Sequence, residues 1–80
     1  MELRDQIVND IITKASSIFG RDDITEETRF IDDLKAKSMH LVQIVTMLED
    51  NYDVEVQYMK FRRYPTVGEA ADFVLSLCEE

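Results

Sequence analysis

The sequence predicts an all-α fold of four helices, and three observations lead to this prediction. Apolar residues recur with the three-to-four-residue spacing of a helix face from Leu3 to Phe19, over residues 38–52, and from Val67 through Leu77. Only two glycines and one proline interrupt the 80 residues, which is few for a β fold with many turns. The stretch Thr66-Val67-Gly68-Glu69 has the form of a capping box and predicts the start of the last helix.

The first two long helices differ in how their apolar residues are spread. In the stretch from Leu3 to Phe19 these residues follow a single face, and Gly20 stands where a helix C-terminus favours glycine. In residues 38–52 they cover more than one face. We therefore expect the second helix either to be the most buried of the bundle or to present an apolar strip to a partner.

Two connections between these helices are less regular. Residues 20–37 form a link that is long for a compact domain. Residues 53–64 begin with alternating apolar residues, but a lone strand would leave its backbone groups unpaired. We therefore predict an extended stretch followed by a short third helix around residues 58–63. The residues expected to pin the long link to the core are Ile24, Phe30, Ile31 and Leu34.

The composition indicates one small acidic domain over residues 1–80. Seventeen Asp and Glu against nine Lys and Arg give a net charge of −8, which repels nucleic-acid phosphates and anionic lipids. No apolar run is long enough for a transmembrane span or a signal peptide, and a single cysteine allows no internal disulfide. We therefore expect a cytoplasmic monomer that neither binds nucleic acid nor spans a membrane.

Residue counts argue against an enzyme and against a metal protein. A structural zinc site needs about four ligands, whereas the chain has one cysteine, Cys78, and one histidine, His40. A Cys–His dyad would require the end of the last helix to reach the start of the second, so we interpret Cys78 as a small apolar residue. The paired acids lack the spacing of a calcium loop and are typical of solvated surface. The sequence thus predicts no catalytic residue.

Ser38 is the residue with the most informative surroundings. On local grounds it is the N-cap of the second helix, a role that serine plays in many proteins. However, Phe30-Ile31-Asp32-Asp33-Leu34-Lys35-Ala36-Lys37-Ser38-Met39 resembles the acyl carrier protein pattern Phe-x-x-Asp/Glu-Leu-Gly-x-Asp-Ser-Leu. The likeness continues without a gap over roughly residues 30 to 74. It includes Val42-Gln43-Ile44, Leu48-Glu49-Asp50-Asn51-Tyr52-Asp53-Val54-Glu55-Val56, Thr66-Val67 and Ala70.

The resemblance implies that Ser38 receives a 4′-phosphopantetheine arm from coenzyme A through a phosphopantetheinyl transferase. The arm's thiol would carry an acyl group as a thioester to acyl-loading, acyl-transfer or synthase enzymes. A helix N-terminus suits this role, because its unpaired N–H groups and dipole favour the phosphodiester anion. Met39, Met47 and Met59 either line an apolar slot for the acyl chain or are ordinary core residues.

The chain departs from the family pattern at positions around Ser38. Lys37 replaces the usual Asp, and His40 and Gln43 replace acids. Lys35 replaces the usual Gly, which puts in doubt any turn at this position that needs a positive φ. The third helix is basic instead of acidic, with Tyr58-Met59-Lys60-Phe61-Arg62-Arg63. We interpret His40 as a neutral surface contact. The residues predicted to recognise partners are Lys37, Met39, His40, Gln43, Met47, Lys60 and Arg62.

These departures have two interpretations, and the function has two as well. They are either drifted surface residues or the mark of a specialised carrier whose partner offers a neutral, apolar or acidic docking surface. The protein is either an acyl carrier modified at Ser38 or an interaction module that keeps the fold and never receives the arm. The sequence leaves open whether the cargo is fatty, hydroxy-fatty, polyketide or amino-acyl.

Overall fold

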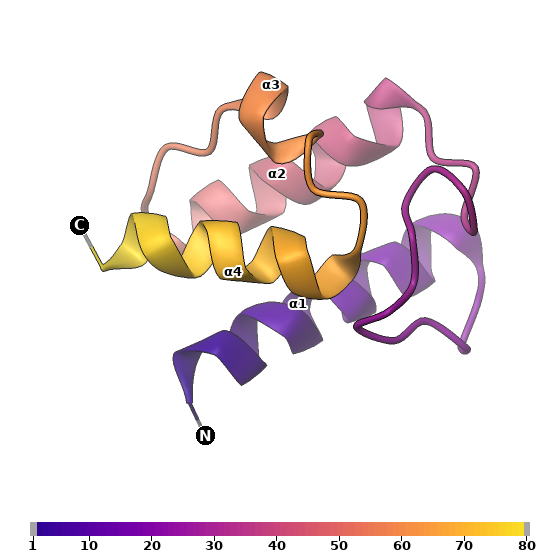
Figure 1. Ribbon diagram of the computed structural model, residues 1–80, viewed down its shortest axis with the longest axis horizontal. Coiled ribbons are helices and arrows are strands. Elements are labelled where there is room, and N and C mark those ends of the chain that lie inside the picture. The colour runs from indigo at the N-terminus through magenta and orange to yellow at the C-terminus, as the bar shows by residue number, and fades with distance from the viewer. Residues whose placement is uncertain (1, 80) are drawn as a thin grey trace.

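Four helices make up the part of the chain that the computed structural model describes, residues 2–79 (Figure 1). They are α1 (Leu3–Phe19), α2 (Ser38–Tyr52), α3 (Tyr58–Phe61) and α4 (Val67–Cys78). The short α3 lies above α2, and α4 packs against α1. The all-α class and the order of three long helices with a short third one are confirmed.

The ends of the helices follow from residues visible in the sequence. Gly20 ends α1 with a φ of 64°, and its N–H donates to the carbonyl oxygen of Ser16. This left-handed conformation costs glycine little, which is why glycine is favoured there. At the start of α4, the N–H of Glu69 donates to Thr66 Oγ1 at 3.2 Å. The predicted N-cap at Thr66 is therefore confirmed.

The core is built from the apolar faces of α1, α2 and α4 and is closed by an aromatic ring from α3. Ile7, Ile44 and Val74 are fully buried representatives of the three long helices. Phe61 of α3 is also fully buried, and its ring lies 5.9 Å from that of Phe30 in the long loop. Burying such a side chain is worth about 1.5–3 kcal/mol, so one ring can hold so short a helix in place.

The long loop between α1 and α2 is attached to the core as expected, with one exception. Ile24, Phe30 and Leu34 are buried, whereas Ile31 is 55% exposed, so its predicted anchoring role is wrong. The N–H of Leu34 donates to the carbonyl oxygen of Arg29, and that of Lys35 to Ile31, which coils residues 29–35 into turns. In this local coil Phe30 and Leu34 face inward together while Ile31 faces solvent.

Main-chain hydrogen bonds fasten the same loop to the start of α4. The N–H of Phe30 donates to Pro65 O at 3.0 Å, and the N–H of Val67 donates to Thr28 O at 3.1 Å. A third bond runs from the N–H of Gly68 to Glu26 O at 3.0 Å. The loop thus reaches α2 from a fixed position.

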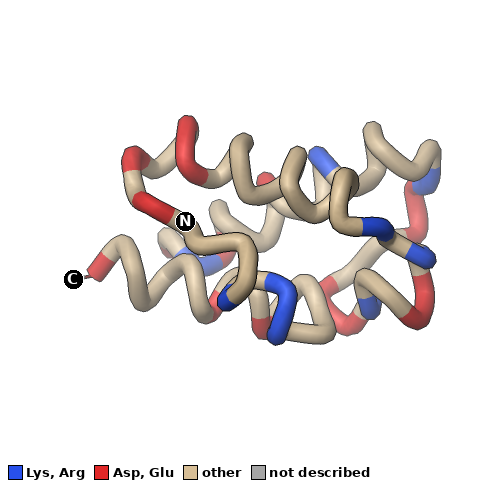
Figure 2. Tube along the Cα trace, turned by 90° about the horizontal axis from the view of Figure 1, so that it is seen from above, with Lys and Arg blue, Asp and Glu red and all other residues tan. Residues whose placement is uncertain are grey.

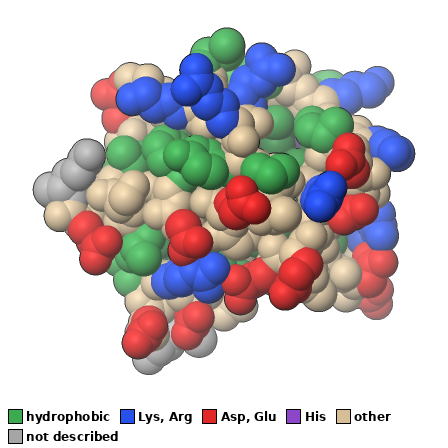
Figure 3. All heavy atoms as spheres, in the orientation of Figure 1, with side chains coloured by type: hydrophobic (Ala, Val, Ile, Leu, Met, Phe, Trp, Pro, Cys, Tyr) green, Lys and Arg blue, Asp and Glu red, His purple; other side chains and the backbone are tan. Residues whose placement is uncertain are grey.

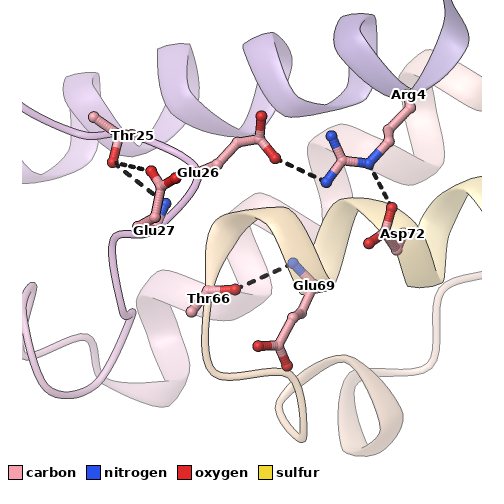
Figure 4. A network of polar contacts seen from close by, with 7 residues as sticks. All are labelled: Arg4, Thr25, Glu26, Glu27, Thr66, Glu69 and Asp72. Carbon is pink, nitrogen blue, oxygen red and sulfur yellow. Dashed lines mark hydrogen bonds and ion pairs between the residues drawn. The ribbon is translucent and has the colours of Figure 1, made fainter.

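A guanidinium group of α1 adds a side-chain link to this arrangement (Figure 4). Arg4 Nε donates to Asp72 of α4 at 2.5 Å, and its Nη2 donates to Glu26 of the loop at 2.8 Å. These hydrogen bonds raise the pKa of Arg4 above its ordinary value, with Asp72 contributing most. One cation thereby joins α1, α4 and the loop.

Candidate functional site

Ser38 is the first residue of α2, and its side chain is exposed. Its hydroxyl has no hydrogen-bond partner among residues 2–79, and the N-cap position belongs to Lys37, with φ −101° and ψ 169°. The prediction that Ser38 caps the helix is therefore wrong. The hydroxyl is not engaged in holding the helix start and is available for chemistry.

His40 performs the capping that was expected of Ser38. Its Nδ1 accepts a hydrogen bond from the Lys37 N–H at 2.9 Å, and its own N–H donates to Lys37 O at 3.0 Å. A nitrogen that accepts in this way carries no proton. The imidazole ring also packs on Phe19 of α1, with ring centroids 4.7 Å apart. His40 is half-buried and joins the start of α2 to the end of α1.

The turn before Ser38 has a left-handed residue that is not glycine. Lys35 has a φ of 55°, a region that L-residues other than Asn and Asp seldom occupy. The N–H groups on either side of this bend are engaged, with Lys35 donating to Ile31 O and Ala36 donating to Phe30 O. The positive φ that the glycine replacement put in doubt is therefore present at Lys35.

A pocket of about 330 Å³ opens directly beside Ser38. It lies where the loop, the start of α2 and α3 meet. The guanidinium of Arg62 lies 5.9 Å from the centre of the Tyr58 ring, a cation–π contact at the pocket wall. The residues that line it are Ile31, Ala36, Ser38, Leu41, Tyr58 and Arg62.

The three methionines predicted for an acyl slot do not line this pocket. Met39 and Met59 are 63% and 62% exposed, and neither is a core residue. Met47 is half-buried and lines a separate groove between α1 and α2. The exposure of Met39 and of Val42 shows that α2 presents an apolar strip to solvent, one of the two alternatives expected for this helix.

The predicted partner-recognition residues are distributed over more than one hollow of the surface. Arg62 lines the pocket beside Ser38, and Lys37 directly precedes Ser38 as the N-cap of α2. Lys60 lines another groove with Phe73 and Leu77. Gln43 and Met47 share the groove between α1 and α2 with Lys14. Sequence reasoning did not place Ile31 and Tyr58 at the site. The sequence signal that could have indicated Ile31 is its position as an apolar residue directly after Phe30 in the motif that leads to Ser38.

Electrostatics around Ser38 differ from those of the rest of the molecule. Residues 34–48 and 57–64 contain five of the nine Lys and Arg and no Asp or Glu. Figure 2 looks down on α3 and shows its basic residues together with those on the chain that enters α2. The acidic residues begin again near the end of α2. The exposed hydroxyl of Ser38 thus lies in the most positive region of an acidic protein.

Comparison with known proteins identifies this arrangement. A family model described as "Phosphopantetheine attachment site" matches residues 9–74. The acyl carrier protein of Chlorobium luteolum is 31% identical over 74 residues, which is 92% of each chain. The chain belongs to the acyl carrier protein family. Acyl carrier proteins of Lactobacillus acidophilus (38% identical, 70% of each chain) and Sulfurovum sp. (34%, covering 66% of this chain and 71% of the relative) are also similar.

As a member of the acyl carrier protein family, the protein is a carrier rather than an enzyme, and its prosthetic group is covalent 4′-phosphopantetheine. The site fits such a group. Ser38 offers an exposed hydroxyl without a hydrogen-bond partner among residues 2–79, and the amides of Ser38 and Met39 at the start of α2 also have no partner there. The adjoining pocket has the apolar side chains of Ile31 and Leu41 and the cation of Arg62 to receive the base of the arm.

Cys78 is partly buried at the end of α4, and burial raises the pKa of its thiol. Between Glu2 and Glu79 no helix has both the length and the apolar character required to cross a membrane.

Proposed function

We propose that Ser38 carries the 4′-phosphopantetheine arm and that the chain works over residues 1–80 as a single acyl carrier domain. One observation supports this most directly: Ser38 is exposed, makes no capping bond and begins a fifteen-residue helix inside the region that the family model matches. In the sequence from Phe30 to His40, Ser38 is the only residue with a hydroxyl group.

The residues around Ser38 support this role physically. The N-terminus of α2 has a partial positive charge, which stabilises the negative charge that a phosphodiester brings to the serine oxygen. Lys37 adds a full positive charge next to it. When bound, the prosthetic group supplies the thiol that holds an acyl group as a thioester. The protein contributes a fixed attachment point and a surface for its partners.

We further propose that this is a specialised carrier of fatty acid, lipid or related biosynthesis. It would be modified by a phosphopantetheinyl transferase and then used by dedicated acyl-loading and acyl-transfer enzymes. The departures from the family pattern support this proposal, because Lys35, Lys37, Lys60 and Arg62 are all exposed. Residues in contact with solvent are free to determine which partner binds, whereas the buried positions keep the fold.

Intact-mass measurement after incubation with coenzyme A and a phosphopantetheinyl transferase tests the attachment. The native protein and a Ser17→Ala control, which changes an exposed serine of α1, should each gain one phosphopantetheine mass. Ser38→Ala should gain none while staying folded. Because the Ser38 hydroxyl has no hydrogen-bond partner in the described part of the chain, its loss should change the free energy of unfolding by less than about 0.5 kcal/mol. A mass gain on Ser38→Ala would refute the assignment, and an unmodified native protein would favour the interaction module.

A further inference from the structure

The lysines and arginines of the molecule divide into paired and unpaired groups. Arg4, Arg21 and Arg29 each form ion pairs with carboxylates. The cationic face, as we define it, consists of five exposed residues that have no carboxylate within 4.0 Å in the described part of the chain. These residues are Lys35, Lys37, Lys60, Arg62 and Arg63.

Three of the five residues of the cationic face lie at the approach to Ser38, and the other two, Lys60 and Arg63, lie in and just after α3. Lys35 and Lys37 lie on either side of Ala36, which lines the pocket, and Arg62 lines the same pocket from the other side. Figure 3 shows Lys and Arg side chains gathered along the upper edge of the molecule, over α3, next to apolar side chains. Most of the Asp and Glu side chains in that view lie lower. Exposed Ile31 and Met59 add apolar area among the cations.

This segregation of charge has no evident role in the fold. The protein has seventeen acids, yet none lies in residues 34–48 or 57–64, and the five neighbouring cations repel one another. Folding stability would instead be served by placing carboxylates among them. Binding offers a reason for the pattern, because complementary charge speeds encounter and rejects wrong partners.

We propose that the enzyme exchanging acyl groups with this carrier docks on the cationic face through a surface rich in Asp and Glu. Ile31 and Met59 pack into apolar pockets of the enzyme surface, and Arg62 pairs with a carboxylate beside the entry to the enzyme's active site. The proposal rests on the proposed function of Ser38, since the docked enzyme must reach the arm attached there. Gln43 and Met47, in the groove between α1 and α2, lie outside this docking surface.

A charge-exchange experiment tests the proposal. The probes are a carrier-dependent acyl-loading synthetase that docks through Lys and Arg, and its variant with those residues replaced by Glu. At low salt, kcat/KM for the native holo carrier should be at least about tenfold higher with the Glu variant. This difference should shrink at 0.15 M salt, where the screening length is about 8 Å. Equal values, or a preference for the Lys and Arg enzyme, would overturn the proposal.

Two carrier variants provide the matched comparison. Arg62→Glu changes the cationic face, and Lys14→Glu makes the same change of charge on α1, at a lysine that also has no ion pair. Arg62→Glu should lose most of the preference for the Glu variant of the enzyme. Lys14→Glu should keep it. If both variants lose this preference to the same extent, the net charge rather than the cationic face determines kcat/KM, and the proposal fails.

A binding measurement separates this inference from the proposed function. The apo protein is titrated with each synthetase, and amide chemical shifts are followed by NMR. Shifts confined to residues 31–38 and 58–63, and stronger with the Glu variant, support the docking surface whether or not the arm is ever attached. Shifts centred on α1 or α4 overturn it. Failure of Ser38 modification appears independently, in the intact mass.

Competing occupants of the cationic face are tested in the same way. Vesicles of phosphatidylcholine with phosphatidylserine and a single-stranded RNA oligonucleotide serve as probes for an anionic membrane and a nucleic acid. Neither should bind the native protein detectably at 0.15 M salt, because a membrane or an RNA strand extends beyond the cationic face and meets the seventeen Asp and Glu of the chain. If the native protein binds the vesicles or the RNA, and Arg62→Glu abolishes that binding, the assignment to an acidic protein partner is overturned.

Discussion

Replacing Lys35 by glycine should stabilise the protein, and the backbone shows why. Lys35 has a φ of 55°, and Gly20 has nearly the same value, 64°. A Cβ atom at Gly20 would meet no heavy atom within 4 Å. The two positions therefore allow the same backbone conformation to be tested in opposite directions, with Lys35→Gly removing a Cβ and Gly20→Ala adding one.

The magnitude follows from two opposing effects on the free energy of unfolding. A left-handed conformation destabilises the folded state of an L-residue by roughly 1–2 kcal/mol, and glycine avoids this strain. Glycine has more conformational freedom in the unfolded chain, however, which lowers the stability of the folded state by about 0.4–1 kcal/mol. Lys35→Gly should therefore be more stable by about 0.5–1 kcal/mol, or roughly 2–8 °C in Tm for a domain of this size. Gly20→Ala should be less stable by a similar amount.

Thermal and urea unfolding of four proteins provides the assay. Lys35→Ala serves as the control, because it removes the same charge as Lys35→Gly but keeps the Cβ atom. The stability difference between these two variants then reports the backbone alone. If Lys35→Gly is no more stable than Lys35→Ala, the left-handed strain at Lys35 is not real. If Gly20→Ala unfolds at the native temperature, the reasoning fails at both positions.

Three further predictions follow from other contacts. Thr66→Ala should lower the free energy of unfolding by about 1 kcal/mol, because the hydrogen bond from the Glu69 N–H is lost. Thr66→Ser keeps the hydroxyl and should retain most of the native stability in urea unfolding. Equal losses of stability in the two variants would contradict the cap. Burial and a 2.5 Å hydrogen bond to Asp10 raise the pKa of Tyr52 above its usual range. The stability from the neutral phenol should be complete below about pH 10 and decline above it, and an equally steep decline in Tyr52→Phe would contradict this. Sodium chloride at moderate concentration or millimolar magnesium should raise Tm, because counterions relieve the self-repulsion of a net charge of −8; an unchanged Tm in calorimetry would contradict that.

The helices could be predicted from the sequence because their cause is local and repeated. The spacing of Ile7, Ile11 and Ala15 buries one face of α1, and all three residues are fully buried in the structure. Gly20 and Thr66 marked helix ends through the conformations and hydrogen bonds that their residue types favour. Ser38 was located by the motif around it, and its exposure agrees with a role outside the core.

The errors occurred where one contact outside the pattern decides the structure. Ser38 had the residue type of an N-cap, but the imidazole of His40 already accepts the Lys37 N–H. Ile31 was apolar, but the turns of residues 29–35 direct Phe30 and Leu34 inward and leave Ile31 in solvent. Neither competition is visible in residue types or spacing, because each depends on which atoms the backbone brings together.

The way the long loop is fastened gives the protein unusual freedom to evolve. Its bonds to the start of α4 join main-chain atoms, and every amino acid but proline has the N–H that Phe30, Val67 and Gly68 contribute. Exposed positions such as Glu27, Ile31 and Asp32 can therefore be changed by mutation or by design while the serine stays in place. Natural selection could in this way change the surface that partners contact beside Ser38, without rebuilding the scaffold beneath it.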